Sequence, residues 1–208
     1  MTSRSFGFLS ATGVALLVAA ACSASKPAPA PPAPEVAKPN TAAEFRETAT
    51  IKDLMDSIVD PNADFLWDSV STIVTRKGID ERRPRTPEEW KEVRRHAIAM
   101  IEATNLIIMD GRKVANPGEK SENPGIELGP EEIQMLIDED RPTLIQRAHA
   151  LHDAGMKALA AIDKKDVDGL SDAGEAIDEA CEQCHLKYWY PPNTPEILKK
   201  ASVRKAPL

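Results

Sequence analysis

Two cysteines and a histidine stand close together near the end of the chain, in the segment Cys181-Glu182-Gln183-Cys184-His185. The chain of 208 residues has one other cysteine, Cys22. A redox pair of the thioredoxin type uses the same C-x-x-C spacing, but at a helix N-terminus after a strand, where the helix dipole stabilises the thiolate. Residues 181–184 instead fall at the C-terminal end of a predicted helix, which argues against that chemistry.

A structural zinc site is the second chemistry that a cysteine pair allows. It needs four ligands, and only two cysteines lie in the predicted folded part. The spacing of His96, His149 and His152 gives no reason to add them to the pair. A zinc-stapled interaction module therefore remains the weaker reading, and it predicts a colourless protein.

Covalent haem attachment is the third chemistry, and C-x-x-C-H is its motif. It needs two thiols that reach the two vinyl groups along one porphyrin edge, and an imidazole next to the second thiol that turns under the iron. On a helix, positions 181, 184 and 185 share one face, so this spacing supplies that geometry. We therefore predict one covalent haem c, with thioether bonds to Cys181 and Cys184.

Apolar residues elsewhere recur at helical spacing and indicate an all-α fold. One apolar stripe follows residues 51–59, and a second segment, with a kink or break at Asp60-Pro61, is expected to continue as helix to about Gly78. Further helices are predicted at 87–109, 142–164 and from about 166 to before Pro191, with a long loop at 112–140 that contains a short helix at 131–137. Four helices with mostly short connections predict an antiparallel four-helix bundle with a C-terminal haem-binding helix.

A four-helix bundle with one C-x-x-C-H motif on its last helix resembles cytochrome c′ and its low-spin relatives, the class II cytochromes c. The resemblance covers about residues 43–190 and is specific at Cys181-Glu182-Gln183-Cys184-His185. It implies that Cys181 and Cys184 bind the haem and that His185 is the proximal axial ligand of the iron. Proteins of this family are often dimers through their first two helices, so the resemblance also allows a homodimer.

The sixth iron position separates two functions in the family that this sequence resembles. Relatives with an apolar residue there bind small gases, and relatives with a methionine there are six-coordinate electron carriers. Met55 lies on the apolar stripe of the first predicted helix, at about the corresponding place, and a thioether is a suitable ligand for haem iron. The competing interpretation is that Met55 only packs, since methionines commonly fill helix interfaces. Rival ligands are Met100, Met156 and His96, and Trp67, Trp90 and residues 188–190 are candidate haem walls.

The N-terminal segment has the layout of a bacterial export signal. Arg4 precedes an uncharged apolar run that ends in three alanines before Cys22. We predict a lipoprotein-type signal peptide at 1–21, lipid attachment at Cys22, a Pro/Ala-rich tether at 22–41 and the cytochrome domain at 42–208. Ordinary cleavage that leaves Cys22 free is the alternative. The expected location is the periplasm, with a lipid anchor in a bacterial membrane.

The chain is acidic, with 33 Asp and Glu against 26 Lys and Arg. Such a charge repels nucleic acid, and it suits a redox partner protein with a basic docking patch. No acid–base or nucleophile constellation stands out, so an enzyme is the least supported class. The sequence thus predicts a single-electron carrier, with a five-coordinate protein that binds nitric oxide or carbon monoxide as the alternative.

Overall fold

The computed structural model describes residues 46–197, which lie within the compact unit Asn40–Leu208. The elements are the helices α1 (Ile51–Leu54), η2 (a π-helix, Met55–Val59) and α2 (Asp60–Ser69), the strands β1 (Thr72–Thr75) and β2 (Gly78–Glu81), and the helices α3 (Pro87–Ile107), α4 (Pro130–Glu139), α5 (Arg141–Lys164) and α6 (Val167–Tyr188). The predicted signal peptide, the lipid-bearing Cys22 and the tether fall outside the described residues.

Local sequence accounts for where the helices begin. Thr50 and Thr86 each form a reciprocal capping box, with Asp53 and Glu89 respectively, so the side chains satisfy backbone N–H groups that have no partner in the helix. Pro87 follows at the first helical position, where its missing N–H costs nothing. The Asp166 carboxylate accepts from the backbone N–H of Gly169 and starts α6 directly after α5.

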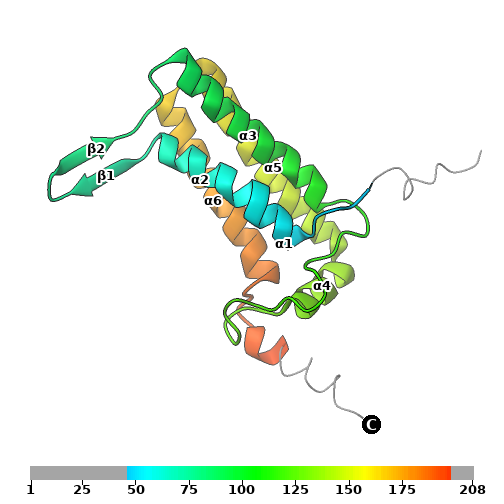
Figure 1. Ribbon diagram of the computed structural model, residues 1–208. Helices are drawn as coiled ribbons and strands as arrows, with labels where there is room; N and C mark the ends of the chain where they lie inside the picture. The colour runs from blue at the N-terminus through cyan, green and yellow to red at the C-terminus, as the bar shows by residue number, and fades with distance from the viewer. Residues whose placement is uncertain (1–45, 198–208) are drawn as a thin grey trace, which may run out of the picture. The chain divides into compact units, whose positions relative to one another are not determined.

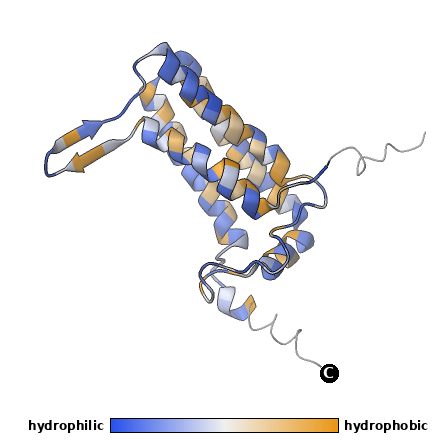
Figure 2. Cartoon of the chain, in the orientation of Figure 1, coloured by the Kyte–Doolittle hydropathy of each residue, from blue (hydrophilic) through white to orange (hydrophobic). Residues whose placement is uncertain are grey.

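Four long helical bodies form an antiparallel bundle, which confirms the predicted fold class. The continuous α1–η2–α2 body is the first helix, and α5 packs against both α3 and α6 (Figure 1). Apolar residues follow the helix faces that meet in the core (Figure 2), among them the fully buried Leu66, Met100, Leu170 and Ile177. The described residues include no helix with both the length and the apolar character that a membrane span needs.

The prediction for the first helix is wrong at its C-terminal end, which was expected near Gly78. It ends at Ser69, and residues 72–81 form a two-stranded antiparallel hairpin, in which Val74 pairs with Ile79. The run Thr72-Ile73-Val74-Thr75 is β-branched throughout, which favours strand, while the apolar pair at 73 and 74 also fits a helical stripe. Gly78, at φ +136°, takes a conformation that other residues rarely adopt and closes the turn.

The predicted break at Asp60-Pro61 is also absent. Pro61 is the second residue of α2; it has no backbone N–H to donate, but the helix continues past it. The irregularity lies before it, in η2, where the backbone N–H of Asp60 donates to the carbonyl of Met55. This five-residue step replaces the four-residue step of an α-helix, so the chain accommodates one extra residue without leaving the helix.

The long connection between α3 and α5 covers one end of the bundle. Backbone N–H groups of Ile51 and Lys52 donate to the carbonyls of Lys113 (2.8 Å) and Val114 (2.9 Å), and that of Leu128 donates to the carbonyl of Trp189 (2.8 Å). The loop and α4 are therefore held against both the start of the first helix and the end of α6.

Candidate functional site

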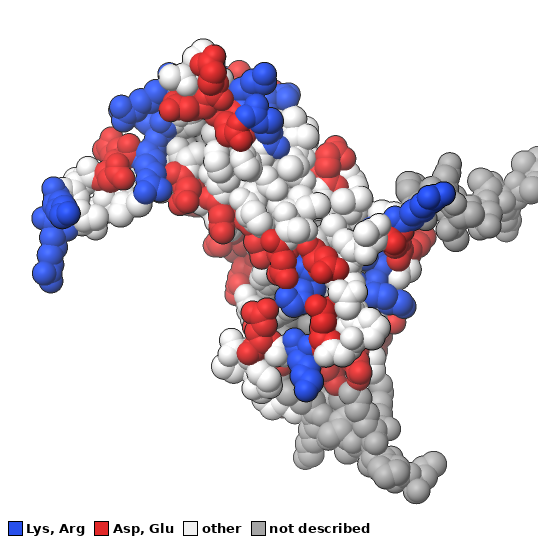
Figure 3. All heavy atoms as spheres, viewed as in Figure 1, with Lys and Arg blue, Asp and Glu red and all other residues white. Residues whose placement is uncertain are grey.

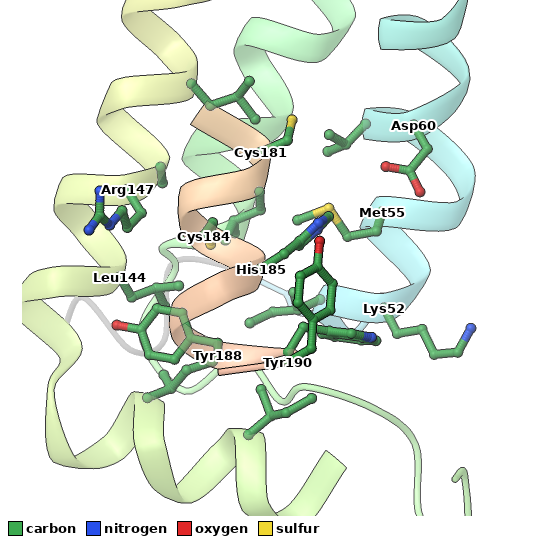
Figure 4. Close-up of a pocket in the computed structure, with 18 of the residues that line it drawn as sticks. Lys52, Met55, Asp60, Leu144, Arg147, Cys181, Cys184, His185, Tyr188 and Tyr190 are labelled. Atoms are coloured by element: carbon green, nitrogen blue, oxygen red, sulfur yellow. The ribbon is translucent and has the colours of Figure 1, made fainter. Parts of the chain in front are cut away.

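A pocket of about 300 Å³ lies at the end of the bundle that the loop and α4 cover. Its lining comes from every helical body of the bundle and from the residues that follow α6 (Figure 4). Most of the lining is apolar, and it includes Ile51, Val59, Ile107, Ile133, Ile137, Leu144, Leu151 and Ala180.

One wall of the pocket carries the motif that the sequence singled out. Cys181, Cys184 and His185 all line the pocket from the last turns of α6. Both cysteines are free thiols and partly buried. Figure 4 shows the His185 ring directed from α6 across the pocket. The helical spacing thus brings both thiols and the imidazole to one site, as the sequence predicts.

Burial keeps both thiols protonated. Loss of solvation raises the pKa of Cys181 from 9.0 to about 12, and the negative charge of Asp60 adds to this effect. The same loss raises the pKa of Cys184 to about 11, against which the positive charge of Arg147 acts only weakly. These thiols lack the depressed pKa of a thioredoxin-type nucleophile.

Met55 lines the same pocket from the opposite wall, at the first residue of η2. Its side chain is partly buried and packs against the core, and Figure 4 shows its thioether on the side toward which His185 points. Because η2 steps by five residues, Asp60 follows Met55 on the pocket side of the helix, and it lines the pocket too. Asp60 is open to solvent on one side, but the pocket atoms desolvate its carboxyl and raise its pKa.

Three aromatic side chains close the base of the pocket. These are Tyr188, Trp189 and Tyr190. The hydroxyl of Tyr188 donates to the carbonyl of Asp140 (3.1 Å), and the hydroxyl of Tyr190 donates to Glu182 (2.6 Å). The other two candidate wall residues lie elsewhere: Trp67 donates to the carbonyl of Gly174 (3.0 Å), and Trp90 is buried near the start of α3.

The rim of the pocket is charged. The Lys52 amine contacts Asp56 at 2.8 Å and Glu122 at 3.3 Å, and these hydrogen bonds raise its pKa to about 12. Asp56 and Glu122 are exposed, so the rim meets solvent while the interior stays apolar.

The rival ligands lie away from this pocket. His96 stacks on Phe65, and its Nδ1 lies 2.6 Å from the amide oxygen of Asn62, so it forms part of the contact between α2 and α3. Met100 is completely buried against α5, and Met156 is 44% exposed. His149 and His152 lie on α5, and within residues 46–197 no three His, Cys, Asp or Glu side chains converge as ligands for a metal ion.

Sequence reasoning missed two polar residues of the pocket. The sequence indicates a helix break at Asp60, because no sequence pattern predicts a π-turn. Arg147 lies in the pocket wall on α5, and its Nε is buried without a hydrogen-bond partner among the described residues. The available signal was a charged residue three positions after the apolar Leu144 and directly before the apolar Ala148 on the same helix.

Comparisons with known proteins give similarity in structure alone. No family model and no curated protein matches the sequence. Among solved structures, a variant of cytochrome c prime from Alcaligenes xylosoxidans in complex with nitric oxide matches with a TM-score of 0.42 and 21% identity, over 69% of this chain and 99% of that one. A second, ferrous variant of the same protein with bound nitric oxide matches with a TM-score of 0.41 and 21% identity, over 68% of this chain and 97% of that one.

Proposed function

We propose that this protein is a monohaem c-type cytochrome that carries single electrons. The observation that carries the proposal is the donor set of one pocket: two buried thiols and an imidazole on α6, and a thioether on the facing wall. Two thiols one helical turn apart with an adjacent imidazole suit covalent haem, and imidazole with thioether is an axial pair of electron-carrying haem proteins.

The chemistry of the pocket lining suits a macrocycle with an apolar body and a polar edge. Its aliphatic and aromatic walls would cover the body and exclude water. The charged rim around Lys52 would leave a polar edge solvated, and the unpartnered Nε of Arg147 leaves a donor for a ligand acceptor. The buried, protonated state of the thiols keeps them from premature reaction.

Each residue has a separate role in this proposal. Cys181 and Cys184 would hold the haem by thioether bonds, and His185 and Met55 would be the axial ligands of its iron. The haem would supply reversible one-electron exchange, while burial and the thioether ligand would raise its potential. The proposal describes a carrier and not an enzyme.

We propose the periplasm as the location, with lipid attachment at Cys22, because the N-terminal residues have the layout of a lipoprotein signal. The proposed partner is a redox protein with a basic docking patch, because the chain carries a net charge of −7.

Visible absorption of the purified, exported protein tests the haem and its ligands together. The oxidised and reduced spectra of the wild type are compared with those of Met55→Ala and of the exposed control Met156→Ala. A sharp reduced α-band that broadens only in Met55→Ala supports six-coordinate iron and the carrier. A protein without haem bands, from a host that attaches haem, overturns the proposal.

Carbon monoxide separates the carrier from the gas-binding alternative. An occupied sixth position makes carbon monoxide binding to the reduced wild type slow, and Met55→Ala accelerates it. Rapid binding to the wild type, unchanged by Met55→Ala, would instead indicate an open iron site and a gas-binding protein.

A further inference from the structure

The β1–β2 hairpin projects from the bundle as an arm at the end of α2, far from α4, which lines the pocket (Figure 1). Both strands are exposed along their whole length, and Val74 and Ile79 are 76% and 68% exposed. A two-stranded hairpin alone in water is marginally stable. The exposed apolar side chains and unpaired backbone groups of this arm are a surface that a partner could cover, and such cover would stabilise the hairpin.

The hydrogen-bond alternation shows which backbone groups of β1 face outward. The N–H of Arg82 donates to the carbonyl of Ser71 (2.9 Å), so 71 and 82 form a bonded pair beside the pair Thr72–Glu81. Bonded and non-bonded pairs alternate in an antiparallel ladder, so Ile73 and Thr75 bond inward to β2. The N–H and C=O groups of Thr72 and Val74 point to the open side, where no backbone partner lies within residues 46–197.

The two edges of this hairpin differ in how they are protected. Strand β2 carries Asp80 and Glu81, and charged residues are a common means of preventing strand addition. Strand β1, with the sequence Thr-Ile-Val-Thr, has neither a charge nor a proline, and Figure 2 shows it as apolar. The β1 edge is thus an unprotected template for another strand.

We propose that β1 pairs antiparallel with β1 of a second copy of this chain, to form a four-stranded sheet across a two-fold axis. The pairing that uses both outward-facing residues of each copy sets Thr72 against Val74 of the second copy, and Val74 against Thr72. The axis then passes between the two Ile73 residues, which lie directly opposite each other. This inference goes beyond the proposed function, because the pocket takes no part in it.

Charge complementarity selects a second copy of this chain as the partner. The hairpin tip carries Arg76 and Lys77, and Figure 3 shows cationic side chains at the end of the arm and acidic ones over the bundle. In the proposed register, the turn residues 76 and 77 at the tip of each arm lie beside the base of the second copy's arm, near residue 70. The cationic tip of each copy thereby approaches the exposed Asp68 of the other, twice in the dimer.

The proposed interface is small, since each copy contributes one four-residue strand and the hairpin tip. Interfaces of this size are weak and reversible. The ten-residue helix α2, about 15 Å long at 1.5 Å per residue, separates the arm from Asp60 at the pocket. Dimerisation is therefore expected to leave the absorption spectrum unchanged.

Charge variants at Ile73 test the two-fold pairing by sedimentation of the purified haem-containing protein over a range of concentrations. We expect a wild-type monomer–dimer equilibrium. Ile73→Lys alone and Ile73→Asp alone should each raise the dissociation constant at least tenfold, because like charges meet at the axis. An equimolar mixture of the two variants should regain dimer, because opposite charges then meet.

A wild type that stays monomeric at every concentration overturns the proposal, and so does dimerisation that both Ile73 variants leave unchanged. A mixture that remains monomeric overturns the two-fold register. Binding of a monomeric wild type to anionic phospholipid vesicles, lost when Arg76 and Lys77 are neutralised, would assign the arm to a lipid surface instead.

Disulfide trapping provides a readout that does not depend on affinity. A facing non-bonded pair has Cα atoms about 4.5 Å apart, within the span of a disulfide. Ile73→Cys should form a covalent dimer under mild oxidation, whereas Val74→Cys, which faces Thr72 of the second copy, should not. Equal trapping of both variants contradicts the register.

Discussion

Burial in the pocket sets the protonation state of the Cys181 and Cys184 thiols. A thiol loses solvation when it is buried, and the neutral form suffers less than the thiolate. The two pKa values, about 12 for Cys181 and about 11 for Cys184, follow from this loss. Folding thus protects both sulfurs from the reactions of exposed cysteines until a partner for them enters the pocket.

Alkylation of the haem-free protein tests this protection. At about pH 8, iodoacetamide should modify the folded chain far more slowly than the same chain in denaturant, because so little thiolate is present. Mass spectrometry of the peptides measures both rates. Modification of both thiols at the denatured rate would contradict the buried site.

The raised pKa values also make the stability of the haem-free protein depend on pH. Both folded pKa values exceed the ordinary thiol value of 9.0, so the native state holds these protons more tightly than the unfolded state. The stabilisation is complete below about pH 9 and is lost as the pH rises toward the folded values. Urea denaturation of Cys181→Ser/Cys184→Ser should therefore show a weaker decline in the free energy of unfolding above about pH 9.

At the scale of elements, the π-helix η2 decides which side chains of the first helix face the pocket. One extra residue between α1 and α2 lets Ile51 and Leu54 stay in the core together with Ala63 and Leu66. Met55 lies at the junction and so faces α6 across the pocket.

Deletion of Ser57, an exposed residue of η2, tests this role. Without the extra residue the helix returns to α geometry, and α1 rotates by about 100° relative to α2. We expect the deletion to broaden the reduced α-band in the same way as Met55→Ala. Ser57→Ala, which keeps the residue count, should leave the spectrum unchanged. A sharp α-band after the deletion would show that η2 does not position the ligand.

Close packing between α3 and α5 gives a second prediction at this scale. A Cβ at Gly155 would lie 2.6 Å from Cγ1 of Ile101 and 3.1 Å from Cε of Met100. Helix propensity alone would favour Gly155→Ala by about 1 kcal/mol, but overpacking of a core typically costs about 1–3 kcal/mol. We expect a net loss in the free energy of unfolding by urea, while Gln146→Ala, at an exposed position of α5, stays near neutral. A Gly155→Ala variant that is more stable than the wild type would mean that α3 and α5 can move apart slightly without loss of packing.

For the whole molecule, charge distribution governs encounters. The chain carries a net charge of −7, although the hairpin and the residues after it are rich in arginine. Figure 3 shows acidic side chains spread over the bundle on the face in view. A basic partner would be attracted to the bundle over distances comparable to the screening length, about 10 Å at 0.1 M salt.

Electron transfer to a basic redox protein should therefore slow as ionic strength rises. The second-order rate constant, measured by stopped flow between about 10 mM and 500 mM salt, should fall by at least tenfold. Transfer to a small neutral oxidant provides the control and should change little. A rate constant with the basic partner that does not respond to salt would exclude the proposed docking.

Much of the fold could be predicted from local sequence. The Thr86 capping box, the apolar spacing of α3, α5 and α6, and the start of α6 near Asp166 are all set by residues within one or two helical turns. The prediction of helix for residues 72–75 was wrong, because a short β-branched run at helical spacing fits either a helix or a strand. Both strands are exposed along their length, so this segment does not pack into the bundle, and where the bundle ends is not a property of residues 72–75 themselves.

In the candidate site, too, some features follow from local sequence and others depend on how the helices pack. Local spacing is enough to predict that Cys181, Cys184 and His185 share a face, because intervals of three and four residues lie within one helix. Tertiary packing brings Met55 and Asp60, more than 100 residues away, into the same pocket and keeps His96 and Met100 out of it. Those positions depend on the π-turn and on how four helices pack, and neither is a property of neighbouring residues alone.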